Sequence, residues 1–118
     1  QRVEGFLALQ PEIGQAMVYG DKRPYLVALI VPDTEFAATW ARAHGQPVEA
    51  LPEVPAFHKE IGAAIERTSA QLSIIERVRK FIIVPQPFTV ENNMMTPSLK
   101  IRRHVIRAAY RERLEALY

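Results

Sequence analysis

The feature that most constrains the fold of this chain is the apolar run YLVALIVPD at residues 25–33. It is short, it contains valine and isoleucine, which favour strands, and its first seven residues carry no charge. A strand with one solvent-exposed face alternates apolar and polar residues, whereas a strand buried on both faces is apolar throughout. We therefore expect a central strand covered on both faces. The run is too short for a membrane span, which needs about 20 apolar residues.

Two further strands are predicted beside this run. The segment QAMVYGD (15–21) precedes it across the turn GDKRP (20–24), where glycine, aspartate and proline are typical turn residues. These two segments predict an antiparallel hairpin. The segment RVRKFIIVPQPF (77–88) predicts a third strand at 80–84, which prolines end. The sequence thus predicts a small three-stranded, mainly antiparallel sheet.

Four helices are expected around this sheet, at residues 2–10, 34–44, 56–72 and 98–117. The third is the clearest, because its apolar residues recur at spacings of three and four. Asp33 or Thr34 can cap the second, and Gly45 can end it. The proline-rich segment 45–55 is typical of a loop, and the pattern across Asn92–Asn93 predicts a small C-terminal hairpin. Together these elements predict an α+β fold with packed helices, in a single domain spanning residues 1–118.

The charge of the chain is unevenly distributed. Residues 1–76 carry six lysines and arginines against ten acidic residues, whereas residues 77–118 carry nine against three. The basic half predicts contact with an anion or an acidic surface, or simply a solvated basic helix. Nucleic-acid binding by the arginines of the last helix is a further alternative. That helix also carries two apolar faces, and the chain shows no recognised nucleic-acid module, which argues against it.

The composition excludes several kinds of catalytic site. The chain has no cysteine, which excludes disulfides and thiol nucleophiles and fits a reducing compartment. His44, His58 and His104 share no metal-ligand spacing, so no metal site is predicted. No glycine-rich phosphate loop and no serine nucleophile elbow are visible. The chain begins at Gln1 without an initiator methionine and enters a helical pattern at once, which we interpret as a piece of a longer protein.

Lys100 is the strongest candidate for a chemical role. Thr96 is a good helix N-cap, Pro97 suits the first helical position, and Ser98 follows. Free amide groups at a helix start, together with a lysine amine, would form a compact anion site. A protonated amine is poorly placed at the positive end of a helix, and a bound phosphate or carboxylate would relieve that. The alternative is that the side chain of Lys100 simply extends into water.

Three stretches of the chain resemble one enzyme family. PFTVENNMMTPSLKIRRHVI (87–106) is similar to the C-terminal signature of adenylate-forming acyl-CoA synthetases, especially the long-chain fatty-acid type, where the pattern is close to F-T-x-E-N-G-x-L-T-P-T-L-K-x-[KR]-R. VYGDKRPYLVALIVPD (18–33) resembles an aliphatic-x-G-D-x-R-P-[YF]-x-x-A-L-I-x-P-[DN] stretch of the same branch. RVEGFLALQPEIGQA (2–16) resembles the V-E-x-x-L-x-x-[SH]-P-x-I-x-Q that opens its C-terminal domain. The matches are collinear over essentially the whole chain.

The resemblance implies that the chain is the mobile C-terminal lid domain of a larger enzyme. Such enzymes join a carboxylic acid to AMP, releasing pyrophosphate, and then transfer the acyl group to coenzyme A. ATP, Mg²⁺ and CoA serve the full-length enzyme, and none of them is expected to bind tightly to this domain alone. The implied partners are the N-terminal adenylation domain of the same chain, which carries most ligand contacts, and a fatty-acid substrate. The lid takes different orientations in the two half-reactions.

The family's catalytic lysine matches Lys100, which reaches the ATP and carboxylate site during adenylation. We assign the loop that presents Lys100 to Thr96, Pro97 and Ser98. We assign a contact to phosphate or to the neighbouring domain to Arg102 and Arg103. The chain departs from the family pattern at Asn93, Met94, Met95 and Ser98, and none of these changes removes the amine.

Several expectations depend on sequence outside this chain. The family's hinge aspartate and the loop after it precede Gln1, so we expect the isolated domain to be inactive. The acyl pocket also lies outside, so an enzyme of the same superfamily acting on another carboxylic acid stays an alternative, as does a stand-alone basic phosphate- or nucleic-acid-binding module. We expect no nucleic-acid partner and a cytoplasmic location, and we leave peripheral membrane contact and the oligomeric state open.

Overall fold

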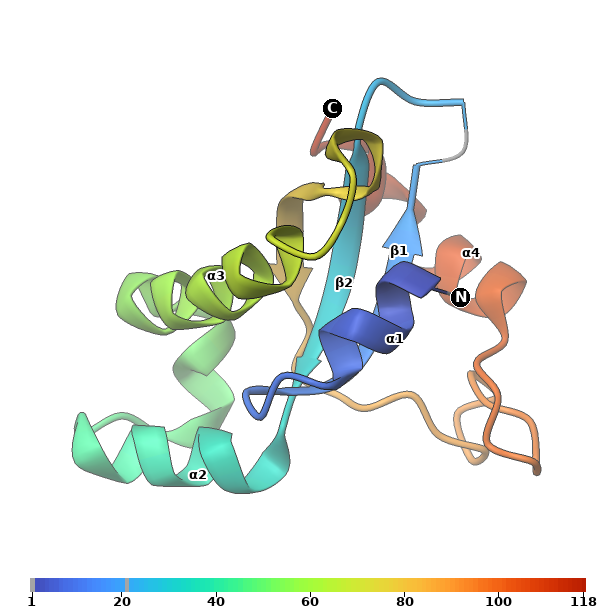
Figure 1. The fold of residues 1–118 in the computed structure, drawn as a ribbon. Coiled ribbons are helices and arrows are strands. Elements are labelled where there is room, and N and C mark those ends of the chain that lie inside the picture. The colour runs from blue at the N-terminus through green and yellow to red at the C-terminus, as the bar shows by residue number, and fades with distance from the viewer. Residues whose placement is uncertain (1, 21) are drawn as a thin grey trace.

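A computed structural model describes residues 2–20 and 22–118 of the chain. Gln1, where the chain begins, and Asp21, which the sequence analysis places in the turn after the first strand, lie outside the described residues. The elements, labelled in Figure 1, are α1 (Arg2–Ala8), β1 (Ile13–Tyr19), β2 (Leu26–Pro32), α2 (Thr34–Ala43), η1 (Val48–Glu53), α3 (Pro55–Ser69), η2 (Ile74–Glu76), β3 (Val78–Ile83) and α4 (Arg103–Glu115), where η denotes a 3₁₀ helix.

The three strands form one sheet in the order β1-β2-β3. β1 and β2 are antiparallel, with Val18 opposite Ala28. β3 pairs with the other edge of β2 in parallel, with Phe81 opposite Ala28. The α+β class and the three-stranded sheet are confirmed, but the sheet is mixed rather than mainly antiparallel. The reason is topological, because α2 and α3 lie between β2 and β3 and carry the chain back to the end of the sheet where β2 begins.

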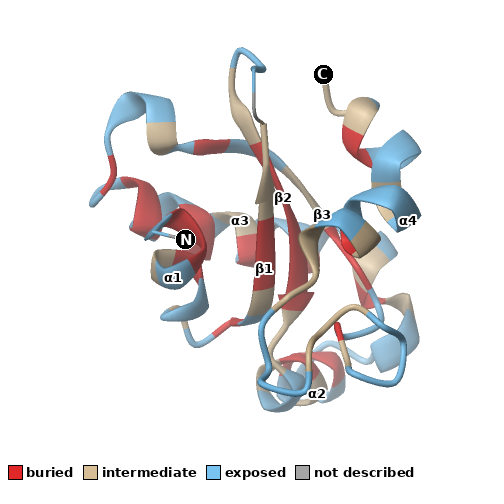
Figure 2. Ribbon diagram, turned by 90° about the vertical axis from the view of Figure 1, so that its right-hand side faces the viewer, coloured by how far each residue is buried: buried red, intermediate tan, exposed pale blue. Residues whose placement is uncertain are grey.

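β2 is covered on both faces, as its sequence predicts. Alternate side chains belong to two separate cores. Ala28 and Ile30 pack with residues of α1, α2 and α3, including Phe57, whereas Val27 and Leu29 pack with residues of α4. Figure 2 shows the buried central strand with α1 on one side and α4 on the other. The sheet therefore separates a larger three-helix layer from a smaller layer built on the C-terminal helix.

The second helix begins and ends where the sequence predicts. The backbone N–H of Phe36 donates to the Asp33 carboxylate at 3.0 Å, which makes Asp33 the N-cap of α2. Gly45 follows the helix with a φ of 64°, the left-handed conformation that glycine adopts easily. The proline-rich segment expected as a loop contains η1, because Leu51 turns inward and is almost fully buried.

The C-terminal region differs from the prediction. The last helix begins at Arg103 rather than at residue 98, and Arg102, not Thr96, is its N-cap residue. The small hairpin lies between Met95 and Ile101, which form an antiparallel bridge, instead of across Asn92–Asn93. The left-handed conformation expected near Asn93 does occur, with a φ of 68°, but it belongs to a turn that precedes the hairpin.

The helix cannot begin earlier because backbone groups of residues 94–102 already form hydrogen bonds within the hairpin. The N–H of Thr96 donates to the carbonyl oxygen of Lys100 at 2.8 Å, and the N–H of Arg102 donates to the carbonyl of Met94 at 2.8 Å. These are pairings between two chain segments running in opposite directions, and a helix starting at residue 98 would need the N–H of Arg102 for the carbonyl of Ser98. Local sequence signals for a helix start were therefore overridden by pairing with the preceding segment.

Candidate functional site

The segment between β3 and α4 projects from the body of the molecule and carries Lys100. It is the orange loop at the lower right of Figure 1. The loop leaves the sheet after Ile83, and its tip is the short hairpin closed by Met95 and Ile101. Its exposed residues include Pro97, Ser98 and Lys100. Lys100 thus lies on a projection rather than at a helix start, which corrects the placement made from the sequence.

The hairpin turn is held by Thr96. The hydroxyl oxygen of Thr96 accepts from the N–H of Lys100 at 3.1 Å and lies 3.0 Å from the hydroxyl of Ser98. The carbonyl of Thr96 accepts from the N–H of Leu99 at 2.8 Å. The side chain of Thr96 therefore stabilises a hairpin turn and does not cap a helix. Pro97 and Ser98 form the tip of the turn. These bonds fix the backbone on both sides of Lys100.

Leu99 adopts an unusual conformation directly before Lys100. Its φ is 65°, in the left-handed region that a leucine rarely occupies. The side chain is 70% exposed, so no burial of the leucine compensates for the strain. Such strain costs roughly 1 kcal/mol or more and persists only where the surrounding structure imposes it. Here the bonds of Thr96 impose it, and the result is a defined direction for the following residue.

The amine of Lys100 is available for an external ligand. Lys100 is exposed, and within residues 2–20 and 22–118 its amine has no hydrogen-bond or salt-bridge partner. Because the backbone of Lys100 is fixed while its side chain is free, the residue can reach toward a separate anionic group. A lysine ammonium is a compact charge on a flexible stem, which suits that task.

The base of the projecting loop is fastened to the sheet by Gln15. Its side-chain amide donates to the carbonyl of Phe88 at 2.9 Å and accepts from the N–H of Phe88 at 2.8 Å. The same amide group lies 3.4 Å from the sulfur of Met95. Phe88 is buried in the same core as Ile106 and Leu114 of α4. The loop is therefore braced at its base even though its tip is exposed.

Arg102 and Arg103, the other basic residues predicted for the site, already have partners inside the chain. The guanidinium of Arg102 donates to the side-chain oxygen of Asn93. Arg103 donates twice to the carboxylate of Glu4, once at 2.6 Å, and Glu4 also accepts from the N–H of Val18 at 2.7 Å. Both arginines thus stabilise the base of the hairpin and the start of α4 in this structure, rather than lying free beside Lys100.

Two residues that support the site received no role from the sequence. Glu4 and Gln15 are both polar and both at least partly buried. The signal was present, because the pattern V-E-x-x-L-x-x-[SH]-P-x-I-x-Q keeps a glutamate and a glutamine at these two positions. Their partners are far away in sequence, so the pattern alone could not show what they bind.

Within residues 2–20 and 22–118, no group of three or more histidine, cysteine, aspartate or glutamate side chains is placed to hold a metal ion. In the same part of the chain, every helix is too short or too polar to cross a bilayer.

Comparison with known proteins identifies the family. The family model described as the AMP-binding enzyme C-terminal domain matches residues 1–118. The chain belongs to this family. The resemblance found in the sequence motifs, and the expected C-terminal domain of an acyl-CoA synthetase, are therefore confirmed at the level of the family.

Curated relatives of this AMP-binding enzyme C-terminal domain include long-chain-fatty-acid–CoA ligases. The chain is 34% identical over 120 residues to the ligase FadD15 of Mycobacterium tuberculosis, covering 98% of this chain and 20% of the ligase. It is 29% identical over 125 residues to long-chain-fatty-acid–CoA ligase 1 of Cavia porcellus, covering 100% of this chain and 18% of that protein. The chain therefore spans about a fifth of the length of these relatives.

Solved structures of a second kind of enzyme show the same fold. The A-PCP didomain of carboxylic acid reductase from Segniliparus rugosus, in complex with AMP, matches with a TM-score of 0.80 and 32% identity. The match covers 99% of this chain and 15% of that one. The adenylation domain of the carboxylate reductase from Mycobacterium chelonae matches with a TM-score of 0.81 and 31% identity, over 99% of this chain and 17% of that one.

Proposed function

We propose that this chain is the mobile C-terminal lid of an ATP-dependent long-chain fatty-acid–CoA ligase, and that Lys100 is its adenylation-step lysine. One observation carries the proposal. In a chain of this family, the lysine that matches the family's catalytic position is exposed on a braced hairpin, and its amine has no partner among the described residues. An unpaired amine on a rigid projection is suited to entering the active site of another domain.

The role proposed for Lys100 is electrostatic. In the first half-reaction a carboxylate oxygen attacks the α-phosphorus of ATP, the acyl–oxygen–phosphorus link forms, and pyrophosphate leaves. Negative charge on the carboxylate and on the phosphate must approach, and a positioned ammonium lowers the free energy of that arrangement. In the second half-reaction the sulfur of CoA displaces AMP from the acyl carbon. Thr96, Pro97 and Ser98 fix the backbone that presents the amine, and we assign them no direct contact with substrate.

The cofactors are proposed for the full-length enzyme. ATP supplies the adenylyl group, Mg²⁺ neutralises its phosphates, and CoA supplies the thiol. We place most of their contacts in the N-terminal adenylation domain of the same protein. The isolated chain is accordingly expected to show no turnover.

The acyl substrate is the less constrained part of the proposal. The ligase relatives favour a long-chain fatty acid. The carboxylic acid reductases, at 31–32% identity, favour the alternative that the superfamily member activates another carboxylic acid. A panel of carboxylic acids of different chain length, assayed by pyrophosphate release from the full-length protein, separates the two. Preference for an aryl or short-chain acid would contradict the long-chain assignment and leave the role of Lys100 intact.

The decisive experiment is Lys100→Ala in the full-length protein. Removing one electrostatic stabiliser of a transition state typically lowers the rate about 10²–10³-fold, and we expect that loss in ATP–pyrophosphate exchange. Thioester formation from a preformed acyl-adenylate should be affected much less. Lys59→Ala, on the exposed face of α3, is the matched control and should change neither rate. Equal loss of both half-reactions would contradict the assigned role.

A further inference from the structure

A row of arginines follows one face of α4, away from Lys100. Arg103, Arg107 and Arg111 are spaced by four residues, which places them one above another on the helix surface. Like charges at this spacing repel each other and destabilise a helix unless a counter-charge is near. The first turn of α4 contains no acidic residue, although acidic residues are favoured there. The helix therefore tolerates an unfavourable arrangement of charge along this row.

The two ends of the row have hydrogen-bonded partners within the chain, whereas in the middle Arg111 has only the charge of Glu115 one turn away, without a salt bridge. Arg103 pairs with Glu4 at one end. At the other end Glu115, the next position in the row, accepts from the hydroxyl of Tyr19 at 2.5 Å and from Arg23. Arg107 and Arg111 are exposed, and the salt bridges found among the described residues include neither of them.

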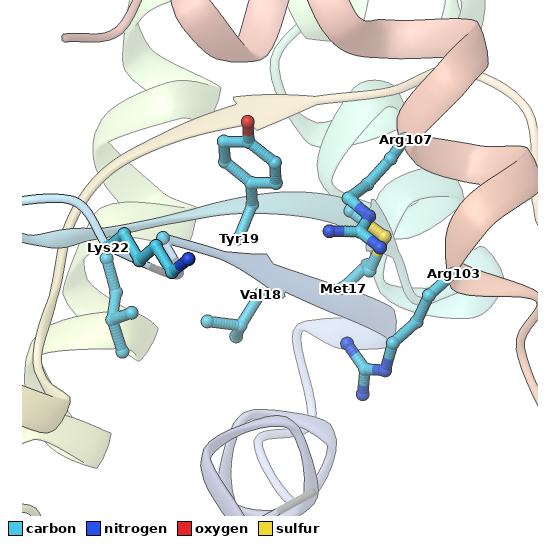
Figure 3. Close-up of a pocket in the computed structure, with 8 residues that line it drawn as sticks. Met17, Val18, Tyr19, Lys22, Arg103 and Arg107 are labelled. Atoms are coloured by element: carbon cyan, nitrogen blue, oxygen red, sulfur yellow. The ribbon is translucent and has the colours of Figure 1, made fainter.

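The arginines without carboxylate partners border a groove between α4 and β1. One hollow of about 420 Å³ lies above Met17 and Tyr19 and is bordered by Arg103, Arg107 and Lys22. Figure 3 shows the two arginines extending from α4 toward β1, with Lys22 on the opposite side of the hollow. A second hollow of about 400 Å³ shares Tyr19 and Arg107 with the first and adds His104 and Arg111, so the two lie side by side along α4.

The lining of this groove selects a class of ligand. A guanidinium group can donate two parallel hydrogen bonds to the oxygens of one phosphate. Each of these charge-assisted bonds is stronger than a hydrogen bond between neutral groups. The first hollow also has an apolar part to its lining, to which the partly exposed side chains of Val18 and Leu26 contribute, whereas Met17 is fully buried. A lone phosphate would leave Val18 and Leu26 uncovered, whereas an organic group attached to the phosphate would contact them.

We propose that the groove between α4 and β1 is a binding site for a phosphate ester, held by Arg107 and Arg111. The ester is either a soluble nucleotide or the headgroup of a membrane lipid, since both present the same phosphate chemistry. The site is separate from Lys100, and the proposal does not depend on the adenylation role of that lysine.

The test is a pair of double variants of the full-length protein with the same loss of charge. Arg107→Gln with Arg111→Gln removes the middle of the row. Arg42→Gln with Arg113→Gln removes two exposed arginines outside the groove, one of them on α4 itself. The soluble probe is adenosine 3′,5′-bisphosphate, measured by calorimetry. The lipid probe is a phosphatidylcholine vesicle containing phosphatidylglycerol, measured by sedimentation. Thermal unfolding checks that both variants fold.

We expect the groove variant to bind one of the two probes with a Kd at least about tenfold higher than that of the unmodified protein. The control variant should bind both probes as the unmodified protein does. The probe that is affected identifies the source of the phosphate. Equal weakening by both double variants would show non-specific charge attraction and overturn the proposal. Unchanged binding of both probes by the groove variant would overturn it as well. Lys100→Ala should leave probe binding in the groove unchanged, so a failed adenylation role is distinguishable from a failed groove.

Discussion

At the scale of single residues, the most informative position is Leu99. The residue occupies a left-handed conformation with its side chain largely in solvent, so the fold keeps it there at a cost and gains no packing from it. The compensation lies in the turn bonds of Thr96, which fix the backbone on both sides of Lys100. Backbone strain of this kind clusters at functional sites in proteins, and here it lies next to the candidate residue Lys100.

Substitutions of Leu99 test whether this strain is real. Leu99→Gly relieves the strain while raising the entropy of the unfolded chain, so the free energy of unfolding should stay within about 0.5 kcal/mol of the original value or rise. Leu99→Val should lower it by roughly 1 kcal/mol, because a β-branched residue is still less compatible with a positive φ. Urea unfolding measures both. A valine tolerated as well as glycine would show that the left-handed conformation is not maintained.

At the scale of elements, Glu4 connects three of them. Its carboxylate on α1 accepts from the N–H of Val18 on β1 and from Arg103 at the start of α4. β1 is an edge strand, so the N–H of Val18 has no neighbouring strand on that side. Glu4 is 9% exposed, and a buried carboxylate of this kind is stable only because each oxygen has a partner.

Removing this carboxylate should therefore destabilise the chain strongly. Glu4→Ala leaves the N–H of Val18 and the guanidinium of Arg103 without their acceptor, and we expect a loss of about 2–4 kcal/mol in the free energy of unfolding. Glu60→Ala, on the exposed face of α3, is the control and should change it by less than about 0.5 kcal/mol. Urea unfolding compares the two. Equal effects would mean that the Glu4 contacts contribute nothing in solution.

At the scale of the whole molecule, the C-terminus is fastened to the hairpin between β1 and β2. The hydroxyl of Tyr25 donates to the carbonyl of Leu117 at 2.7 Å, and the hydroxyl of Tyr118 donates to the carbonyl of Tyr25 at 2.9 Å. Hydrogen bonds from Tyr19 and then from Arg23 lower the pKa of Glu115 below its ordinary value of 4.5. We call these contacts of Tyr25, Tyr118 and Glu115 the clamp. They hold the end of α4 against the hairpin between β1 and β2.

The lowered pKa of Glu115 predicts how the clamp responds to acid. A carboxylate with a lower pKa in the folded state stabilises the protein above its unfolded pKa, and that stabilisation is lost as the pH falls through the folded pKa. Glu115→Gln should therefore be less stable than the original chain near neutral pH, and the difference should shrink below pH 4.5. Thermal unfolding at a series of pH values measures it. A difference that stays constant with pH would contradict an ionised Glu115 in the clamp.

Local sequence signals determined where most helices and strands lie and which of their residues are buried. The unbroken apolar run of β2 required cover on both faces, and the structure has two cores there. The cap at Asp33 and the stop at Gly45 depend only on neighbouring residues, which is why they were predictable. The motifs around Lys100 also indicate the family without any contact, because a motif depends on residue identity and not on geometry.

Contacts between distant segments decided the rest. The direction of β3 depends on where α2 and α3 return the chain, and no pattern within β3 encodes that. The Thr96-Pro97-Ser98 stretch carries sound helix-start signals, yet pairing of residues 94–96 with 100–102 turned it into a hairpin and moved Lys100 onto a projection. Contacts between residues much farther apart in the sequence gave Glu4 and Gln15 their roles, Glu4 with Arg103 and Gln15 with Phe88. The sequence by itself determined the family and the candidate site residues, and the tertiary structure decided how those residues are presented, because hydrogen bonds and burial between segments of the chain outweigh local propensity.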